Sequence, residues 1–138
     1  MRTRQTLPAL RDVLIVEDEN LDADRMFATL RVMFGYTIEV RRASTLAAAI
    51  DAVMARKPEI VFLDDILKPS DDAGQTIPFL RRAGYEGPIV VVSGQASRVR
   101  RTALLAIGAN EVIHKDDVDS VRLTEALNRV FTSESSSN

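Results

Sequence analysis

The 138-residue sequence contains no cysteine, no tryptophan and a single histidine, His114. Without cysteine, the chain can form neither a disulfide nor a thiolate metal site. Its formal net charge of −2 lacks the basic excess that nucleic-acid binding needs. No apolar run approaches the roughly 20 residues of a membrane span, and no apolar segment follows the basic residues Met1–Arg4 as a signal peptide would require. We therefore expect a cytoplasmic protein with no nucleic-acid and no membrane partner.

The composition is that of an ordinary globular domain, with 46% hydrophobic and 28% charged residues. A chain of this length buries one core without disulfides or metals. We expect an N-terminal lead-in at residues 1–11 and a single domain at 12–131. Residues 132–138 are mostly serine and polar, and they are expected to form a disordered C-terminal tail.

Strand and helix patterns alternate five times within residues 12–131. Four short apolar runs bounded by polar residues are typical of buried parallel strands. A weaker strand is expected before the second helix. The expected strands are 13–16, 37–40, 60–63, 88–92 and 111–114. The expected helices are 21–34, 46–53, 77–80, 97–107 and 118–131, with Ser44 or Thr45 and Ser97 as caps, Gly35, Gly84 and Gly108 as stops, and a loop at 68–74. The alternation predicts an α/β fold with a doubly wound five-stranded parallel sheet.

Polar side chains of types used in phosphoryl chemistry follow four of these strands: Glu17 and Asp18, Asp64 and Asp65, Ser93, and Lys115. They should meet at one edge, because ligands of open parallel sheets bind at the carboxyl ends of the strands. Crowded carboxylates repel one another unless a cation lies among them, and oxygen ligands without histidine or cysteine favour Mg²⁺. A hydroxyl and an ammonium suit the oxygens of a transferred phosphoryl group, which an aspartate can accept as an acyl phosphate.

In this order the motifs resemble the receiver domain of two-component response regulators, over Val13 to about Val130. The motifs that carry the resemblance are VLIVEDE from Val13, VFLD from Val61 with Pro69 after it, VVVS ending at Ser93, and GANEVIHK ending at Lys115. The resemblance implies the flavodoxin-like (βα)5 receiver fold. It also implies that a histidine kinase or phosphotransfer protein donates a phosphoryl group to an aspartate.

The resemblance also implies a role for each polar residue. As Mg²⁺ ligands it implies Asp18, Asp64, the main-chain carbonyl of Ile66, and Glu17 through water. Asp64 is the implied phosphoacceptor, with Ser93 hydrogen-bonded to the phosphoryl oxygens and Lys115 paired with them.

The adjacent aspartates leave an alternative for the acceptor. The family usually has a proline four residues after its acceptor, and Pro69 counts back to Asp65. Asp64, however, directly follows four apolar residues, and choosing Asp65 would place Asp64 inside a buried strand, where an unpaired carboxylate is costly. We take Asp64 as the acceptor and Asp65 as the alternative.

Two positions depart from the family's pattern. Val112 stands where the family commonly has an aromatic switch residue, so the usual coupling to an aromatic swing cannot operate in that form. Asp116 follows Lys115 where the family usually has proline. These departures motivate a second hypothesis, a receiver-like interaction module that is not phosphorylated physiologically.

A third hypothesis, a hydrolase of the haloacid dehalogenase type, needs a nucleophile and a general acid two residues apart after the first strand. Only Glu17 and Glu19 offer that spacing, and the length leaves no room for a cap domain. We therefore expect a stand-alone response regulator and not an enzyme. Its output would come through a downstream protein target or a homodimer, by the face that includes residues 98–107, 111–114 and 118–129. Arg98, Arg100 and Arg101 on that face are expected to be solvated.

Overall fold

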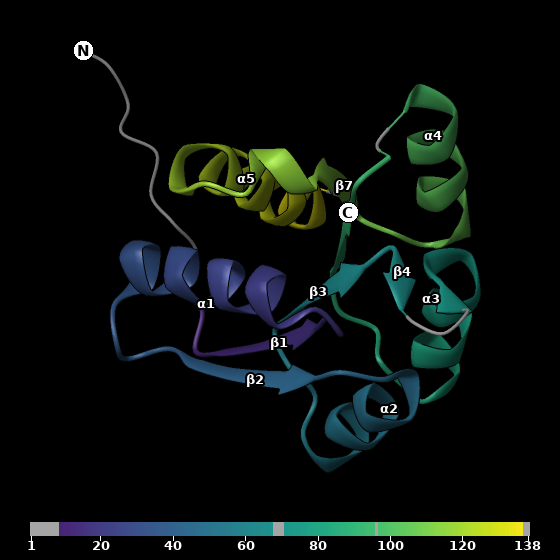
Figure 1. Cartoon of the computed structure of the whole chain (residues 1–138), viewed down its shortest axis with the longest axis horizontal. Helices are drawn as coiled ribbons and strands as arrows, with labels where there is room; N and C mark the ends of the chain where they lie inside the picture. Colours follow the sequence, from purple (N-terminus) through teal and green to yellow (C-terminus); the bar gives the residue numbers. More distant parts are fainter. Residues whose placement is uncertain (1–8, 68–70, 96, 137–138) are drawn as a thin grey trace.

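A computed structural model describes residues 9–67, 71–95 and 97–136, without the side chains of Asp71 and of 133–136. Its main sheet has five parallel strands in the order β2-β1-β3-β6-β7 (Figure 1). These strands are β1 (Asp12–Val16), β2 (Glu39–Ala43), β3 (Ile60–Asp64), β6 (Ile89–Ser93) and β7 (Glu111–His114). This is the strand order of a doubly wound flavodoxin-like sheet, so the predicted fold class is confirmed.

The helices begin and end at residues whose chemistry explains the boundaries. They are α1 (Asn20–Phe34), α2 (Leu46–Ala55), α3 (Ala73–Arg82), α4 (Arg98–Ile107) and α5 (Ser120–Ser136), with a 3₁₀ turn at Lys115–Asp117. Thr45, Asp72 and Ser97 cap α2, α3 and α4 by accepting backbone N–H bonds. Gly35 and Gly108 end α1 and α4 at positive φ, where glycine is favoured.

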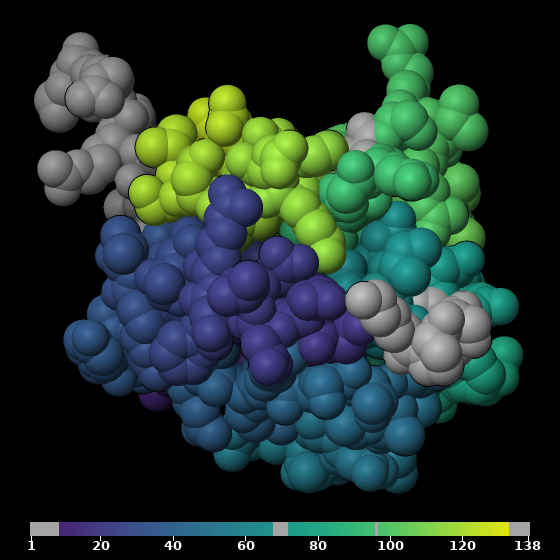
Figure 2. Space-filling model, viewed as in Figure 1, coloured from purple at the N-terminus to yellow at the C-terminus, as the bar shows by residue number. Residues whose placement is uncertain are grey.

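The strands alternate apolar side chains between the two faces of the sheet. One set packs under α2, α3 and α4 and includes Leu14, Val16, Val61, Leu63, Ile89, Val91 and Val112. The other packs under α1 and α5 and includes Val13, Ile15, Ile60, Phe62, Val90, Val92 and Ile113. In space-filling view, α1 and α5 lie against each other over their face (Figure 2). The same alternation applies to the polar residues at the carboxyl ends of the strands, so it determines which of them lie on the same face of the sheet.

Three segments differ from the sequence expectation. The second strand is Glu39–Ala43 and not 37–40, because this edge strand pairs only with β1 and carries the polar Arg41 and Arg42 in place of an apolar run. In the expected loop, β4 (Ile66–Leu67) pairs antiparallel with β5 (Asp71–Asp72); Lys68–Ser70 lie outside the described residues. Helix α5 runs on to Ser136, past the expected start of the tail at Thr132. Of the expected lead-in, only residues 9–11 are described.

The two tyrosines lie away from the polar edge of the sheet. Tyr85 is buried after α3, and its hydroxyl donates to the carbonyl of Pro88 at 3.0 Å. Tyr36 follows α1 and is 89% exposed. Within the described residues, no helix is both long and apolar enough to cross a membrane.

Glu111 ties β7 to two helices. Its buried carboxylate lies 2.6 Å from Arg101 Nη2 of α4 and 2.6 Å from Arg129 Nε of α5. Burial raises the pKa of Glu111, but the bonds from Arg129 and the Val112 N–H and the charge of Arg101 outweigh it and lower the pKa. Arg101 was expected to be solvated; its side chain is 43% exposed, and it also pairs with this buried acid.

Replacing Glu111 by glutamine is expected to lower the free energy of unfolding by about 2 kcal/mol at neutral pH, since bonds to a charged group are lost. Because the folded pKa of Glu111 lies below the ordinary value of 4.5, its contribution is complete above that pH. It is lost as the pH falls through the folded pKa. The free energies of unfolding of the wild type and of Glu111→Gln, measured with urea over a pH series, should therefore converge in acid.

The matched control for this prediction is Glu86→Gln, which changes an exposed glutamate. It should leave the free energy of unfolding nearly unchanged at every pH. A difference between wild type and Glu111→Gln that persists undiminished well below pH 4.5 would show that the charge of Glu111 is not what stabilises the fold.

Candidate functional site

Strand alternation sorts the polar edge of the sheet into two groups. Val16 and Leu63 face α2, α3 and α4, so the next residues, Glu17 and Asp64, face α1 and α5. By the same count, Lys115 faces α1 and α5, while Asp65 and Ser93 face α3 and α4. The adjacent aspartates therefore belong to different groups.

The first group is an acidic cluster. Carboxylate oxygens of Glu17, Asp18 and Asp64 lie within 4.8 Å of one another, and Glu17 and Asp64 are buried. Burial, together with the hydrogen bond and repulsion from Asp64, raises the pKa of Glu17 to about 8. Burial likewise raises the pKa of Asp64. Negative charge on these carboxylates is therefore unfavourable in free energy, and a cation among the three would reduce their mutual repulsion.

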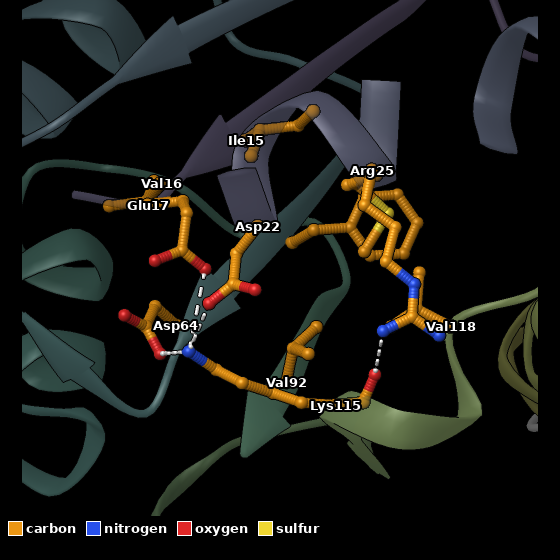
Figure 3. A pocket seen from close by; sticks show the side chains of 11 residues that line it. Ile15, Val16, Glu17, Asp22, Arg25, Asp64, Val92, Lys115 and Val118 are labelled. Atoms are coloured by element: carbon orange, nitrogen blue, oxygen red, sulfur yellow. Dashed lines mark hydrogen bonds and ion pairs between the residues drawn. The ribbon is translucent and has the colours of Figure 1, made fainter. Parts of the chain in front are cut away.

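The ammonium of Lys115 lies among the carboxylates of this group (Figure 3). Its Nζ is 2.9 Å from Asp22 Oδ2, 3.3 Å from Asp64 Oδ1 and 3.8 Å from Glu17 Oε1. Burial lowers the pKa of Lys115, but the hydrogen bond to Asp22 and the charges of Asp64 and Glu17 raise it above its ordinary value. Lys115 is therefore charged at neutral pH, with its charge directed at Asp64.

Helix α1 holds Lys115 from two sides. Asp22 accepts a hydrogen bond from its ammonium, and Arg25, one turn later on α1, donates to the main-chain carbonyls of Lys115 at 3.0 Å and Asp116 at 3.5 Å. These side chains line a crevice of about 20 Å³ (Figure 3). The guanidinium of Arg25 thus holds the turn after β7. This turn contains Asp116, at the position where receiver domains usually have proline.

The second group joins Asp65, Ser93 and Arg100. The Ser93 hydroxyl donates to Asp65 Oδ2 at 2.7 Å. Arg100, in the first turn of α4, donates from Nε to the same oxygen at 3.1 Å and pairs through Nη2 with Asp65 Oδ1. Burial raises the pKa of Asp65, but the bonds from Arg100 and Ser93 outweigh it and lower the pKa. Asp65 is therefore a paired anion.

An open pocket of about 360 Å³ joins the two groups at the edge of the sheet. Its lining residues are Asp18, Glu19, Asp64, Asp65, Ile66, Ser93, Gly94, Gln95 and Lys115. Asp64 and Lys115 of the first group thus line the same pocket as Asp65 and Ser93 of the second.

The structure brings together most residues that the sequence singled out. Glu17, Asp18, Asp64 and Lys115 meet in the first group, and Ile66 lines the pocket. Ser93 is at the edge as expected, but its hydroxyl bonds to Asp65 and not to Asp64.

Two charged residues of the site were not predicted from the sequence, and the role of a third was predicted wrongly. Asp22 and Arg25 drew no comment, although their position three and six residues into the first helix places them beside the strand ends. Arg100 was expected to be solvated, whereas it pairs with the buried Asp65; that expectation is wrong.

Comparison with known proteins identifies one family. Residues 13–128 match the model of the response regulator receiver domain family. The nitrogen assimilation regulatory protein NtrX of Azorhizobium caulinodans is 31% identical over 105 residues, which make up 75% of this chain and 22% of that protein.

Solved structures share the fold. NtrX from Brucella abortus is 26% identical with a TM-score of 0.76, covering 91% of this chain and 28% of that one. A response regulator from Burkholderia pseudomallei, solved with a phosphorylated aspartic acid, a calcium ion and citrate, is 21% identical with a TM-score of 0.74; the match covers 92% and 73% of the two chains. The chain spans less than a third of either NtrX protein.

Proposed function

Because the chain belongs to the response regulator receiver domain family, we propose that Asp64 accepts a phosphoryl group from the phosphohistidine of a histidine kinase or phosphotransfer protein. A carboxylate oxygen of Asp64 attacks phosphorus, the P–N bond breaks as the P–O bond forms, and the leaving imidazole nitrogen takes up a proton. Water later attacks phosphorus, which releases phosphate and restores the carboxylate.

One observation carries the choice of Asp64 over Asp65. The Asp64 carboxylate lies 3.3 Å from the Lys115 ammonium and belongs to the acidic cluster, whereas Asp65 is paired with Arg100 and Ser93. An acceptor needs a free oxygen on the open side and positive charge beside the phosphoryl oxygens. Lys115 would stabilise the charge that develops on those oxygens, and Ser93 would donate its hydroxyl to one of them.

The donor set fits Mg²⁺. Three carboxylates within 4.8 Å of one another, with no histidine or cysteine among them, form the kind of oxygen site that hard divalent cations prefer. We assign Asp18, Asp64 and the carbonyl of Ile66 as direct ligands and Glu17 as a ligand through water. When bound, Mg²⁺ would neutralise charge on the phosphoryl oxygens.

The proposed role is that of a phosphorylation-controlled switch and not of an enzyme with its own substrate. Phosphorylation would change how the α4, β7 and α5 face docks to a downstream protein or a second copy.

The test is intact-mass spectrometry of the full chain incubated with acetyl phosphate. We expect the mass to rise by one phosphoryl group when Mg²⁺ is present and to stay unchanged when Mg²⁺ is chelated. Failure of the wild-type chain to gain a phosphoryl group from acetyl phosphate or from a phosphorylated histidine kinase would favour the unphosphorylated interaction module instead. The buried Val112, which replaces the family's aromatic switch, is the observation behind that alternative.

A further inference from the structure

We propose that Asp65 and Arg100 are positioning residues that couple the Ser93 hydroxyl to helix α4, so that phosphorylation of Asp64 alters the first turn of α4 through them. This inference rests on the proposed function. It concerns Asp65 and Arg100 of the second group, which the proposed phosphoryl transfer does not use, and their contact with Ser93, which it does use.

The first step is the geometry of the Asp65 carboxylate. It is buried, and its side-chain donors are one hydroxyl and one guanidinium, those of Ser93 and Arg100, with a further hydrogen bond from the backbone N–H of Ala73. A buried carboxylate depends on such donors, because losing one leaves charge without a partner at a large cost. Ser93 and Arg100 are therefore the two side chains that help to set the orientation of Asp65.

The second step follows from the chemistry of a hydroxyl. Ser93 has one O–H proton and can donate to one acceptor well at a time. That proton is directed to Asp65 Oδ2 at 2.7 Å, while the Ser93 oxygen accepts the N–H of Gln95 at 3.0 Å. Donating to a phosphoryl oxygen on Asp64 requires Ser93 to leave Asp65. The two hydrogen bonds exclude each other.

The third step is the connection to α4. Once Ser93 leaves, Asp65 keeps Arg100 as its side-chain partner, and a phosphoryl dianion on the adjacent residue competes for the same guanidinium. Arg100 lies in the first turn of α4, and its backbone N–H donates to the Ser97 cap at 3.1 Å, so a change in its pairing acts on the start of that helix. This route needs no aromatic residue, and Val112 in the family's switch position is packed in the core.

The experiment compares hydrogen exchange of the α4 amides before and after phosphorylation by acetyl phosphate with Mg²⁺, with occupancy measured by intact mass in the same samples. In the wild type, phosphorylation is expected to increase exchange in α4. In Asp65→Asn, exchange should already be raised without phosphorylation, and the phosphorylation-dependent increase should be lost. Ser93→Ala, which removes only a hydroxyl, should lose the increase as well.

Arg101→Gln is the matched control, because it removes another arginine–carboxylate pair between α4 and the sheet without touching Ser93. It should raise basal exchange in α4 yet keep the phosphorylation-dependent increase. This result would distinguish a signal passed from Ser93 to α4 from a general destabilisation of that helix. An increase of wild-type size in phosphorylated Asp65→Asn or Ser93→Ala would overturn the inference while leaving the proposed function intact. No phosphoryl gain by the wild type would overturn both.

Discussion

Asp64→Asn is expected to abolish the gain of a phosphoryl group from acetyl phosphate, as read by intact mass. An amide oxygen is far less nucleophilic than a carboxylate, and asparagine removes one of the three clustered carboxylates, 3.3 Å from Lys115. Asparagine matches aspartate in size, so the fold should persist, which circular dichroism checks.

Two further variants give this result its meaning. Asp24→Asn makes the same chemical change at an exposed position of α1 and should be phosphorylated like the wild type. Asp65→Asn should also gain one phosphoryl group, because its carboxylate is occupied by Ser93 and Arg100. A gain in Asp64→Asn together with none in Asp65→Asn would move the acceptor to Asp65.

Lys115→Met is expected to slow phosphorylation by acetyl phosphate about a hundredfold, which is typical for the loss of one donor to a transition-state oxyanion. Methionine keeps most of the length and packing of lysine but removes the charge that lies beside Asp64 and Glu17. The rate at which the phosphorylated mass grows, at saturating Mg²⁺, is the measurement.

The stability of Lys115→Met offers a second readout. Without the ammonium, Asp22, Glu17 and Asp64 lose their common counter-charge, so the midpoint of thermal unfolding should fall without Mg²⁺ and recover when Mg²⁺ is added. Lys57→Met removes an exposed lysine and should change neither readout. A wild-type phosphorylation rate in Lys115→Met would remove Lys115 from the proposed chemistry.

The sequence predicted the fold and the edge of the sheet at which the site lies, because both follow from local patterns. Four apolar runs place their terminal polar residues at one sheet edge whatever the details of packing. The exception was β2, whose edge position relaxes the need for an apolar run, as Arg41 and Arg42 illustrate. The start of the fourth helix was predictable because Ser97 caps it through bonds to nearby residues.

The adjacent aspartates show where such reasoning could have gone further. Alternation along β3 places Asp64 with Glu17 and Lys115, and Asp65 with Ser93, and this count needs only the sequence and the direction of each strand. Counting back from Pro69 gives the opposite preference, because it assumes a loop length that the segment after Leu67 need not share.

What the sequence could not supply are pairs between distant segments. Arg25 and Lys115 are separated by 90 residues, and Arg100 and Asp65 by 35. Nothing near Arg100 in the sequence distinguishes it from Arg98, and only the approach of α4 to the end of β3 makes one of them a partner of a buried acid. Such pairs become visible once the helices are placed on the sheet.

The lack of tryptophan leaves the protein with almost no absorption at the red edge of the aromatic band, where tryptophan is excited selectively. These 138 residues contain no tryptophan, Tyr85 is buried beyond α3, Tyr36 is exposed after α1, and Val112 removes the aromatic ring from the switch position. In a titration with a tryptophan-containing partner, emission excited at the red edge of the absorption band comes from the partner alone. Fluorescence changes then report on the surroundings of the partner's own rings.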